Sequence, residues 1–395
     1  MATGPASLQI SGSSQVTINT ANPTQILLWS VVGLALVGVL SPYSYNALPA
    51  TTLLEAVFVI CSVAMLRRRM DKRLAMFSVV AFVYVLASFA VSTFNNTNGL
   101  DFVQAYKAFI YIPIISAFVG KSGELDAKFI SRIFWILAFF FLIKYGYSRA
   151  LDLNYRMGRR PGVLDENNFE LILLNFIFYI THSRRRIGAN LLATAILIAV
   201  VGLSGSRSGA IGAAIALAMM ALERPRERVV VLSFIIPVGF LAGMLIISER
   251  SIASLEEIDR FRFLTIFLRE VSDWTPLGFI FGARPLTPLS PDSCNQLAFY
   301  SGLFSRSGDG TCYSVILHSY ALRVIFDHGV FGVVILIGHL YFAYRSSAAT
   351  RRQMICLCLI TTTSALSISA FNSIYYAISA AVLLSSSRNL SRVSS

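Results

Sequence analysis

Charge is the scarcest property of this sequence. Only 13% of its residues are charged, whereas 55% are hydrophobic, and the mean hydropathy is +0.67. So few charged side chains cannot make the water-facing surface of a soluble protein, and that class is therefore excluded. The hydrophobic residues come in long runs rather than in a helical or strand alternation, which is typical of segments that meet lipid.

The sequence also lacks the features of a signal peptide, of a membrane barrel and of a metal site. Residues 1–24 contain no Lys or Arg and therefore lack the basic start of a signal peptide, so we expect a polar cytoplasmic tail there. The apolar runs are too long for the strands of a membrane barrel, which leaves helices as the way to satisfy the backbone in lipid. No cluster of His, Cys, Asp and Glu has the spacing of a metal site, and neither a metal nor another cofactor is expected.

The apolar runs predict an all-α polytopic membrane protein with about twelve transmembrane helices. They form a single transmembrane domain over residues 25–387, followed by a second cytoplasmic tail at 388–395. The predicted spans are 25–40, 50–66, 74–93, 102–120, 129–147, 168–182, 190–204, 209–222, 229–247, 329–344, 355–371 and 373–386.

The net charge of +13 comes from basic residues whose positions indicate the membrane topology rather than a nucleic-acid site. Short basic clusters fall on alternate connections and hold 18 of the 33 Lys and Arg residues. The positive-inside rule makes this side the cytoplasm and places both termini there, as in a multi-pass protein of the bacterial inner membrane. The clusters are Arg67–Arg69 with Lys72 and Arg73, Lys121 with Lys128, Arg184–Arg186, Arg224 with Arg226 and Arg228, Arg345 with Arg351 and Arg352, and Arg388 with Arg392.

Two long connections, near 148–167 and 248–328, then lie on the periplasmic side, where we expect the working surface. They break the charge rule, because they carry many Arg residues and no Lys. Arg suits bidentate recognition of phosphate or carboxylate. The structural alternative is salt bridges to loop carboxylates together with contacts to lipid headgroups.

Cys294 and Cys312 both lie in the second periplasmic loop. In an oxidising compartment we predict a disulfide between them, worth about 3 kcal/mol by loop-entropy reasoning, with two unpaired thiols as the alternative. Cys61, Cys356 and Cys358 fall inside predicted spans, where we expect them to act as small apolar packing residues.

Four charged residues, Glu55, Lys107, Lys144 and Glu170, lie inside predicted spans. Charges at membrane depth are costly, which makes them functional candidates. Each lies within about six residues of the periplasmic end of its span, or roughly 9 Å, which predicts a polar chamber that opens outward. Transporter sites, by contrast, usually lie near the midplane. For the two Lys residues the alternative is snorkelling.

Three segments form a recognisable series. Residues 160–169 (RPGVLDENNF) enter the sixth span, residues 203–209 (LSGSRSG) turn between the seventh and eighth, and residues 318–332 contain His-Ser, nine residues, and then Gly-x-x-Gly. Together they resemble motifs of the O-antigen ligase/polymerase superfamily, bacterial membrane glycosyltransferases that use undecaprenyl-diphosphate-linked glycans. The sequence departs from the family pattern in having Glu166 where Pro is common and Ser319 where Asn is common. The first loop also lacks a clear match to the Arg-and-Gly patterns associated with ligases and polymerases.

The same residues suggest chemistry on their own. Ser206, Arg207 and Ser208, flanked by glycines at the start of a helix, could form an anion site, or simply a tight turn. Residues 252–271 predict an amphipathic interfacial helix that offers Arg262 and Arg269 to a lipid diphosphate, the alternative being a purely structural helix.

His318 stands at the end of the second loop near the membrane surface. Its ordinary pKa suits proton transfer at neutral pH, and the alternative is a hydrogen-bonded structural His. Arg323 and Asp327 are four residues apart and could pair with each other. His328 is a weaker alternative to His318, and we interpret His182 and His339 as structural.

The resemblance implies metal-independent, inverting glycosyl transfer on the periplasmic face. His318, Arg160 and Arg207 are the implied catalytic residues. Arg262, Arg269, Asp165, Asn167, Ser206 and Arg323 are expected to bind substrate. The expected partners are the undecaprenyl-diphosphate-linked glycan, an acceptor glycan or lipid A core, the lipid bilayer, a chain-length regulator and a flippase, but no nucleic acid.

Three functions remain open at this stage. A polysaccharide polymerase would use another lipid-linked glycan as acceptor, and an O-antigen ligase would use lipid A core or a protein. The incomplete ligase pattern favours the polymerase, although the His-Ser and Gly-x-x-Gly spacing favours the ligase. A lipid-linked-oligosaccharide flippase is the alternative from another class.

Overall fold

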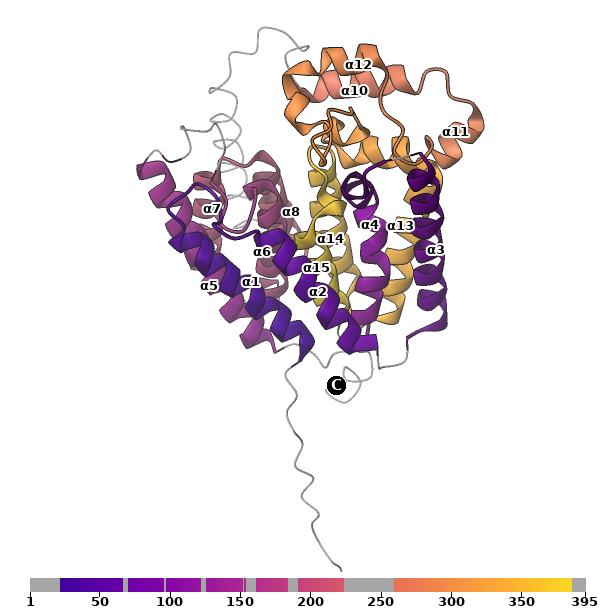
Figure 1. Cartoon of the computed structure of the whole chain (residues 1–395). Coiled ribbons are helices and arrows are strands. Elements are labelled where there is room, and N and C mark those ends of the chain that lie inside the picture. Colours follow the sequence, from indigo (N-terminus) through magenta and orange to yellow (C-terminus); the bar gives the residue numbers. More distant parts are fainter. Residues whose placement is uncertain are drawn as a thin grey trace, which may run out of the picture.

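A computed structural model describes residues 22–66, 70–95, 97–121, 126–151, 153, 161–183, 191–223 and 259–385. The described chain is all-helical, apart from one isolated β-bridge between Pro288 and Tyr313. Helices α1–α8 and α13–α15 form a bundle, and the segment with α10, α11 and α12 lies across one end of it as a cap (Figure 1). We use "cap" below for residues 259–319.

The bundle helices follow the predicted spans closely in most cases. They are α1 (Pro23–Leu40), α2 (Ala50–Leu66), α3 (Lys72–Phe94), α4 (Gly99–Phe118), α5 (Ala127–Ala150), α6 (Asn167–His182), α7 (Leu191–Ser204), α8 (Arg207–Glu223), α13 (Tyr320–Ser346), α14 (Arg351–Ala365) and α15 (Ile374–Leu384). The cap contains α10 (Asp259–Glu270), α11 (Pro276–Phe281), α12 (Pro291–Gln296) and the 3-10 helices η4 (Ala298–Leu303) and η5 (Ser314–Leu317). The predicted span 229–247 and the first part of the predicted amphipathic helix lie outside the described residues.

Four of the described helices, α1, α3, α5 and α13, are long and apolar enough to cross a membrane by length and composition. Helices α2, α7 and α15 are apolar but shorter. The protein therefore has the character of a helical membrane protein.

Two predicted boundaries are wrong. Helix α13 begins at Tyr320, nine residues before the predicted start, because the chain stays helical up to Gly329 and resumes after it. Helix α14 ends at Ala365, and the short helix η6 (Ala370–Asn372) separates it from α15. The first error comes from assigning the polar residues before Gly329 to the loop, and the second from treating an apolar run as one continuous helix.

Contacts between helix ends define two ends of the bundle. The Gly120 N–H donates to the Leu384 carbonyl at 2.8 Å, and Lys121 Nζ donates to the Met65 carbonyl at 3.0 Å. The ends of α2, α4 and α15 therefore meet at one level, which we call the inner end. The cap covers the opposite, outer end (Figure 1).

Polar side chains at the helix starts explain where several bundle helices begin. Asp71, Asn98 and Asp126 each accept a hydrogen bond from a backbone N–H in the first turn of α3, α4 and α5. Thr350 and Gln353 form a reciprocal capping box at the start of α14. These polar residues separate apolar runs and so set where each helix begins.

Burial differs sharply between helices. Helices α6 and α15 are buried on almost every side, whereas α3 exposes apolar side chains along most of its length. A soluble protein would not leave such a face uncovered. The bundle is thus built around α6 and α15, with α3 at its apolar periphery.

Candidate functional site

The first outer connection is held by a buried carboxylate. Glu170, in the first turn of α6, accepts hydrogen bonds from the backbone N–H groups of Val163, Leu164 and Asp165 at 2.6–3.2 Å. The Tyr145 hydroxyl donates to the same carboxylate at 2.5 Å. Glu170 is completely buried, and its four donors satisfy it internally. Its position inside a span is therefore explained by a structural contact with the loop that precedes the helix.

The outer ends of α1 and α2 hold the same loop from the other side. Asn46 Nδ2 donates to the Val163 carbonyl at 2.9 Å, and Gly162 N–H donates to the Ser44 carbonyl at 2.9 Å. A side chain at Gly38 would collide with the Val163 carbonyl. Residues 161–165 are therefore packed into the bundle, and Asp165 stays exposed at its edge.

The other charges at membrane depth make separate contacts. Lys107 Nζ forms an ion pair with Glu55 at 2.6 Å, to which the Tyr111 hydroxyl also donates at 2.9 Å. Lys144 is fully buried and donates to the carbonyls of residues 41 and 43 and to a Tyr hydroxyl at 2.6–2.9 Å. Both ammonium groups thus have partners within the protein. The described hydrogen bonds of these charges hold helices and loops together.

The turn between α7 and α8 packs directly on the start of α6. Asn167 is fully buried and donates to the Ser204 carbonyl at 2.8 Å. Asn168 Oδ1 accepts from the Ser206 hydroxyl at 2.7 Å and from the Ser208 hydroxyl at 3.2 Å. These bonds join two of the three recognised segments at the outer end.

Ser206 and Arg207 occupy the start of α8. The Ser206 hydroxyl accepts from the Gly209 N–H at 3.0 Å, so it caps the helix while it binds Asn168. Arg207 is the first residue of the helix and is half-buried. Arg149, from the end of α5, brings its guanidinium to within 3.4 Å of where a side chain at Gly205 would begin. Two Arg residues and a helix start therefore surround this turn, and they provide a positive potential there.

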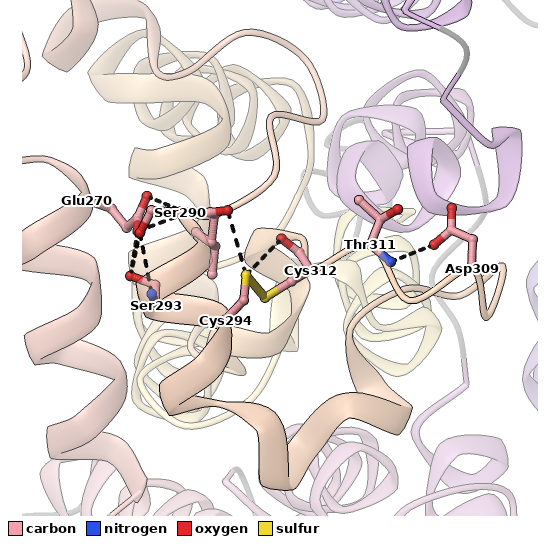
Figure 2. The surroundings of a disulfide bond; sticks show 8 residues. Glu270, Ser290, Ser293, Cys294, Asp309, Thr311 and Cys312 are labelled. Atoms are coloured by element: carbon pink, nitrogen blue, oxygen red, sulfur yellow. Dashed lines mark hydrogen bonds between the residues drawn. A yellow bond between two sulfur atoms is a disulfide. The ribbon is translucent and has the colours of Figure 1, made fainter.

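Within the cap, a disulfide joins Cys294 to Cys312, as predicted (Figure 2). The Glu270 carboxylate, at the end of α10, accepts from the hydroxyls of Ser290 and Ser293 at 2.5 Å each, which fixes α10 to the start of α12. The Thr311 N–H holds the pKa of the exposed Asp309 carboxyl below its ordinary value. The cap is therefore held together by a disulfide and by side-chain hydrogen bonds.

The main apolar interior of the cap is completed by Phe326 of α13, and a second cluster joins Leu286, Tyr313 and Val315 of the cap to α4. The main interior contains Phe263, Ile266, Phe267, Val271, Leu289, Leu297, Phe304, Cys312, Ile316, Leu317 and Phe326. Arg262 and Arg269 lie on the opposite, exposed surface of α10. The predicted amphipathic character of this helix is confirmed for its described part.

His318 lies where the cap joins α13, in a backbone conformation that is rare for a residue with a side chain. Its φ is +53° and ψ is −32°, and only one other non-glycine residue of the described chain, Leu286, has a positive φ. Such a conformation costs energy and persists only where the surroundings hold it. The half-buried imidazole packs on Phe263 of α10, with 5.6 Å between ring centroids.

The residues after His318 are pinned to the segment between α14 and α15. The Ser319 hydroxyl donates to the Ala365 carbonyl at 3.2 Å, and the Tyr320 N–H donates to the Ile368 carbonyl at 3.3 Å. Arg323 donates to the Ser369 hydroxyl at 2.6 Å. This stapling explains how the turn at His318 is kept in place.

Arg323 is almost completely buried and does not pair directly with Asp327. It donates to Ser369 and to the Gln104 carbonyl, whereas both Asp327 oxygens lie 2.7 Å from the Ser314 hydroxyl. The two side chains therefore form no direct hydrogen bond, because each turns to a different neighbour. Among the described residues, Arg323 Nε has no hydrogen-bond partner. The Arg323 Nε–H is thus an unused hydrogen-bond donor beside the turn that carries His318.

Asn372 enters the hydrogen-bond ladder of α4. Its amide donates to the Gln104 carbonyl at 2.8 Å and accepts from the Ala108 N–H at 3.0 Å, two groups that would otherwise bond to each other. An Asn in an apolar stretch was the only sequence signal for this role, and sequence reasoning missed it.

The Gly-x-x-Gly element has a packing role. Gly329 has φ +62°, and a side chain there would collide with the backbone of Ile280 and Gly282. A side chain at Gly332 would collide with His328, which is buried against Tyr84 and hydrogen bonded to its hydroxyl at 2.8 Å. His182 and His339 are also buried and hydrogen bonded, as expected of structural residues.

The predicted site residues thus fall into two groups at the outer end. Asp165, Asn167, Ser206 and Arg207 gather around the start of α6, and His318, Arg323, Arg262 and Arg269 belong to the cap and its junction with α13. Helices α14 and α15 lie between α6, α7 and α8, which hold the first group, and α13, which holds the second (Figure 1). Arg160 lies outside the described residues.

Comparison with known proteins adds no relative: no family model, no curated protein and no solved structure matches the chain. Any functional conclusion therefore rests on the residues and contacts described above.

Proposed function

We propose that the chain is a multi-pass enzyme of the bacterial inner membrane, with about twelve spans. The inner end and both termini would face the cytoplasm, and the cap would face the periplasm. Two independent features support this orientation. The basic clusters lie on connections predicted for one side. The disulfide lies in the cap, at the opposite end, and disulfides persist in oxidising compartments.

The proposed reaction is glycosyl transfer from an undecaprenyl-diphosphate-linked glycan, with polymerisation of polysaccharide as the leading assignment. The observation that carries it is the strained, half-buried His318 at the junction of cap and bundle, beside the helix that exposes Arg262 and Arg269. Strained residues gather at active sites because the surrounding structure holds them for function. Among the described residues, no cluster could hold a metal ion.

In the proposed mechanism, Arg207 and an Arg of α10 hold the diphosphate, together with Arg160 from the first loop. The acceptor hydroxyl attacks the anomeric carbon while the bond from that carbon to the diphosphate oxygen breaks, so configuration inverts. The His318 imidazole accepts the hydroxyl proton and later releases it to water. The Arg side chains stabilise the charge that develops on the leaving undecaprenyl diphosphate.

The first test concerns His318. We expect His318→Ala and His318→Gly to lower transfer by about 10²–10⁴-fold, the usual contribution of a general base. Both variants remove the imidazole, but Gly tolerates a positive φ, so the Gly variant should accumulate in the membrane at least as well as the Ala variant. Transfer in membranes that contain a lipid-linked glycan is the measurement. Full activity in the well-folded Gly variant would disprove the role of His318.

The second test separates the possible functions. In a deletion strain, lipid-linked glycans are separated by length and assigned to a leaflet. Single repeats that accumulate on the outer leaflet indicate a polymerase. Full-length chains stranded on undecaprenyl diphosphate indicate a ligase, the second candidate, which the His-Ser and Gly-x-x-Gly spacing of residues 318–332 favours. Single repeats trapped on the cytoplasmic leaflet would overturn both and indicate a flippase.

A further inference from the structure

Helix α11 presents an exposed apolar surface that is free of charged side chains. Leu277, Phe279, Ile280 and Phe281 are all exposed, Leu277 by 64%. Residues 274–283 contain no charged side chain, whereas the exposed surface of α10 carries Arg262 and Arg269. Exposed apolar patches of this kind mark a contact surface.

The position of α11 identifies what this surface meets. The Ala283 N–H donates to the Phe326 carbonyl at 2.7 Å, so the end of α11 is bonded to α13 just before its break at Gly329. The Phe281 ring lies 5.8 Å from the Phe331 ring of α13, which lies 5.9 Å from the Tyr84 ring of α3. Helix α11 therefore contacts the part of the bundle that packs on α3.

The depth of this contact follows from helix geometry. Tyr84 precedes Phe94, the last residue of α3, by ten residues, which places it about 15 Å below the outer end of that helix. Because Phe281 of α11 contacts Phe331, which contacts Tyr84, α11 reaches below the outer end of α3, an apolar helix long enough to cross a membrane. Figure 1 shows α11 at the edge of the cap, next to the outer end of α3.

We infer that α11 is embedded in the outer leaflet and that lipid acyl chains cover its exposed surface. This surface continues into exposed apolar residues of the adjoining bundle, Val330 and Val334 on α13 and Val83 on α3. An apolar patch that is continuous with a lipid-facing surface is expected to have the same partner. Lipid would then anchor the cap at the side where it meets the break in α13. This inference rests on the membrane location of the bundle and not on the proposed reaction.

The test is fluorescence quenching in vesicles by phospholipids that carry bromine on an acyl chain. The full chain, with Cys61, Cys356 and Cys358 replaced by Ala and the disulfide intact, carries one labelled cysteine from Leu277→Cys or, as a second position, Ile280→Cys. Val83→Cys on α3 is the lipid-facing control. Phe299→Cys is the matched cap control, because Phe299 is 87% exposed but belongs to η4, which packs beside α12.

Labels at positions 277 and 280 should be quenched to the same extent as the label at 83, and the label at 299 should not be quenched. The vesicles contain no isoprenoid lipid, so quenching reports ordinary acyl chains. Quenching at 277 and 280 no stronger than at 299 would overturn the inference. Label–label contact at 277 without quenching by lipid would also overturn it and would identify a second copy of the chain as the partner.

Discussion

The two outer connections of this protein are held in different ways. Residues 161–165 have hardly any interior of their own, and they are fixed to the bundle by hydrogen bonds that they donate to Glu170 and Ser44 and one that they accept from Asn46. The cap has its own apolar core, a disulfide and the Glu270 contacts with Ser290 and Ser293. It also packs on the bundle, through Leu286, Tyr313 and Val315 against α4 and through the approach of Gly282 to Gly329.

This difference predicts how the folding of each connection depends on the bundle. The conformation of residues 161–165 depends on the bundle, so a change in one is a change in the other. We expect the cap to loosen before the bundle, because most of its apolar core and its disulfide lie within residues 259–319. The proposed site draws on both, with Asp165 and Arg207 on the side of the first loop and His318 on the side of the cap.

The largest expected effect on stability is that of Glu170→Ala. It leaves three backbone N–H groups and the Tyr145 hydroxyl without their acceptor in a buried place. Because each of the four orphaned buried groups costs about 1–3 kcal/mol, we expect a loss of at least about 4 kcal/mol. Thermal unfolding of the purified protein in detergent would measure it.

The matched control is Glu170→Gln, which keeps one acceptor oxygen and should lose distinctly less. Both the first loop and the bundle helices should be affected together in the Ala variant. A Glu170→Ala variant as stable as the Gln variant would mean that the carboxylate does not hold the loop, and the contrast between the two connections would fail.

The second prediction addresses the contact between cap and bundle. In Gly329→Ala the added carbon would meet the backbone of Ile280 and Gly282, at a φ of +62°. Adding the cost of a positive φ, about 1–2 kcal/mol, to that of overpacking, about 1–3 kcal/mol, gives a loss of about 2–5 kcal/mol. Thermal unfolding and protease sensitivity of the cap are the measurements.

Gly146→Ala in α5 is the control, because nothing lies within 4 Å of the added carbon. As a helical Gly→Ala change with open space around it, it should be neutral or stabilise the protein by up to about 1 kcal/mol. Equal effects of the two substitutions would show that the glycine contact does not join the cap to the bundle.

The sequence was a good guide to the elements and a poorer guide to their contacts. Long apolar runs predicted the bundle helices, since the fit of an apolar segment to lipid depends only on its own residues. The disulfide followed from two cysteines in one loop. The roles of Glu170 and Asn372 did not follow, because each depends on backbone groups brought close only by the fold.

The same limit applies to the candidate site. The pattern of residues 318–332 drew attention to His318, but its positive φ and its packing on Phe263 are properties of the folded chain. Arg323 and Asp327 could pair by sequence, because they are four residues apart on a helix. Ser369 and Ser314, from other segments, compete for them successfully. Helical spacing identifies neighbours on one helix and cannot reveal the partners that other helices supply.

The most local expected effect is that of the disulfide, because it should be confined to the cap. In Cys294→Ser with Cys312→Ser, the constraint on an 18-residue separation is lost, which is worth about 3 kcal/mol by loop entropy. The cap core and the Glu270 contacts remain, so we expect faster proteolysis within residues 259–319 and an unchanged thermal unfolding of the bundle. Addition of a reductant to the unaltered protein should give the same result. If the bundle unfolds together with the cap in either experiment, the cap is not an independent unit, and the two outer connections would be held by one cooperative structure.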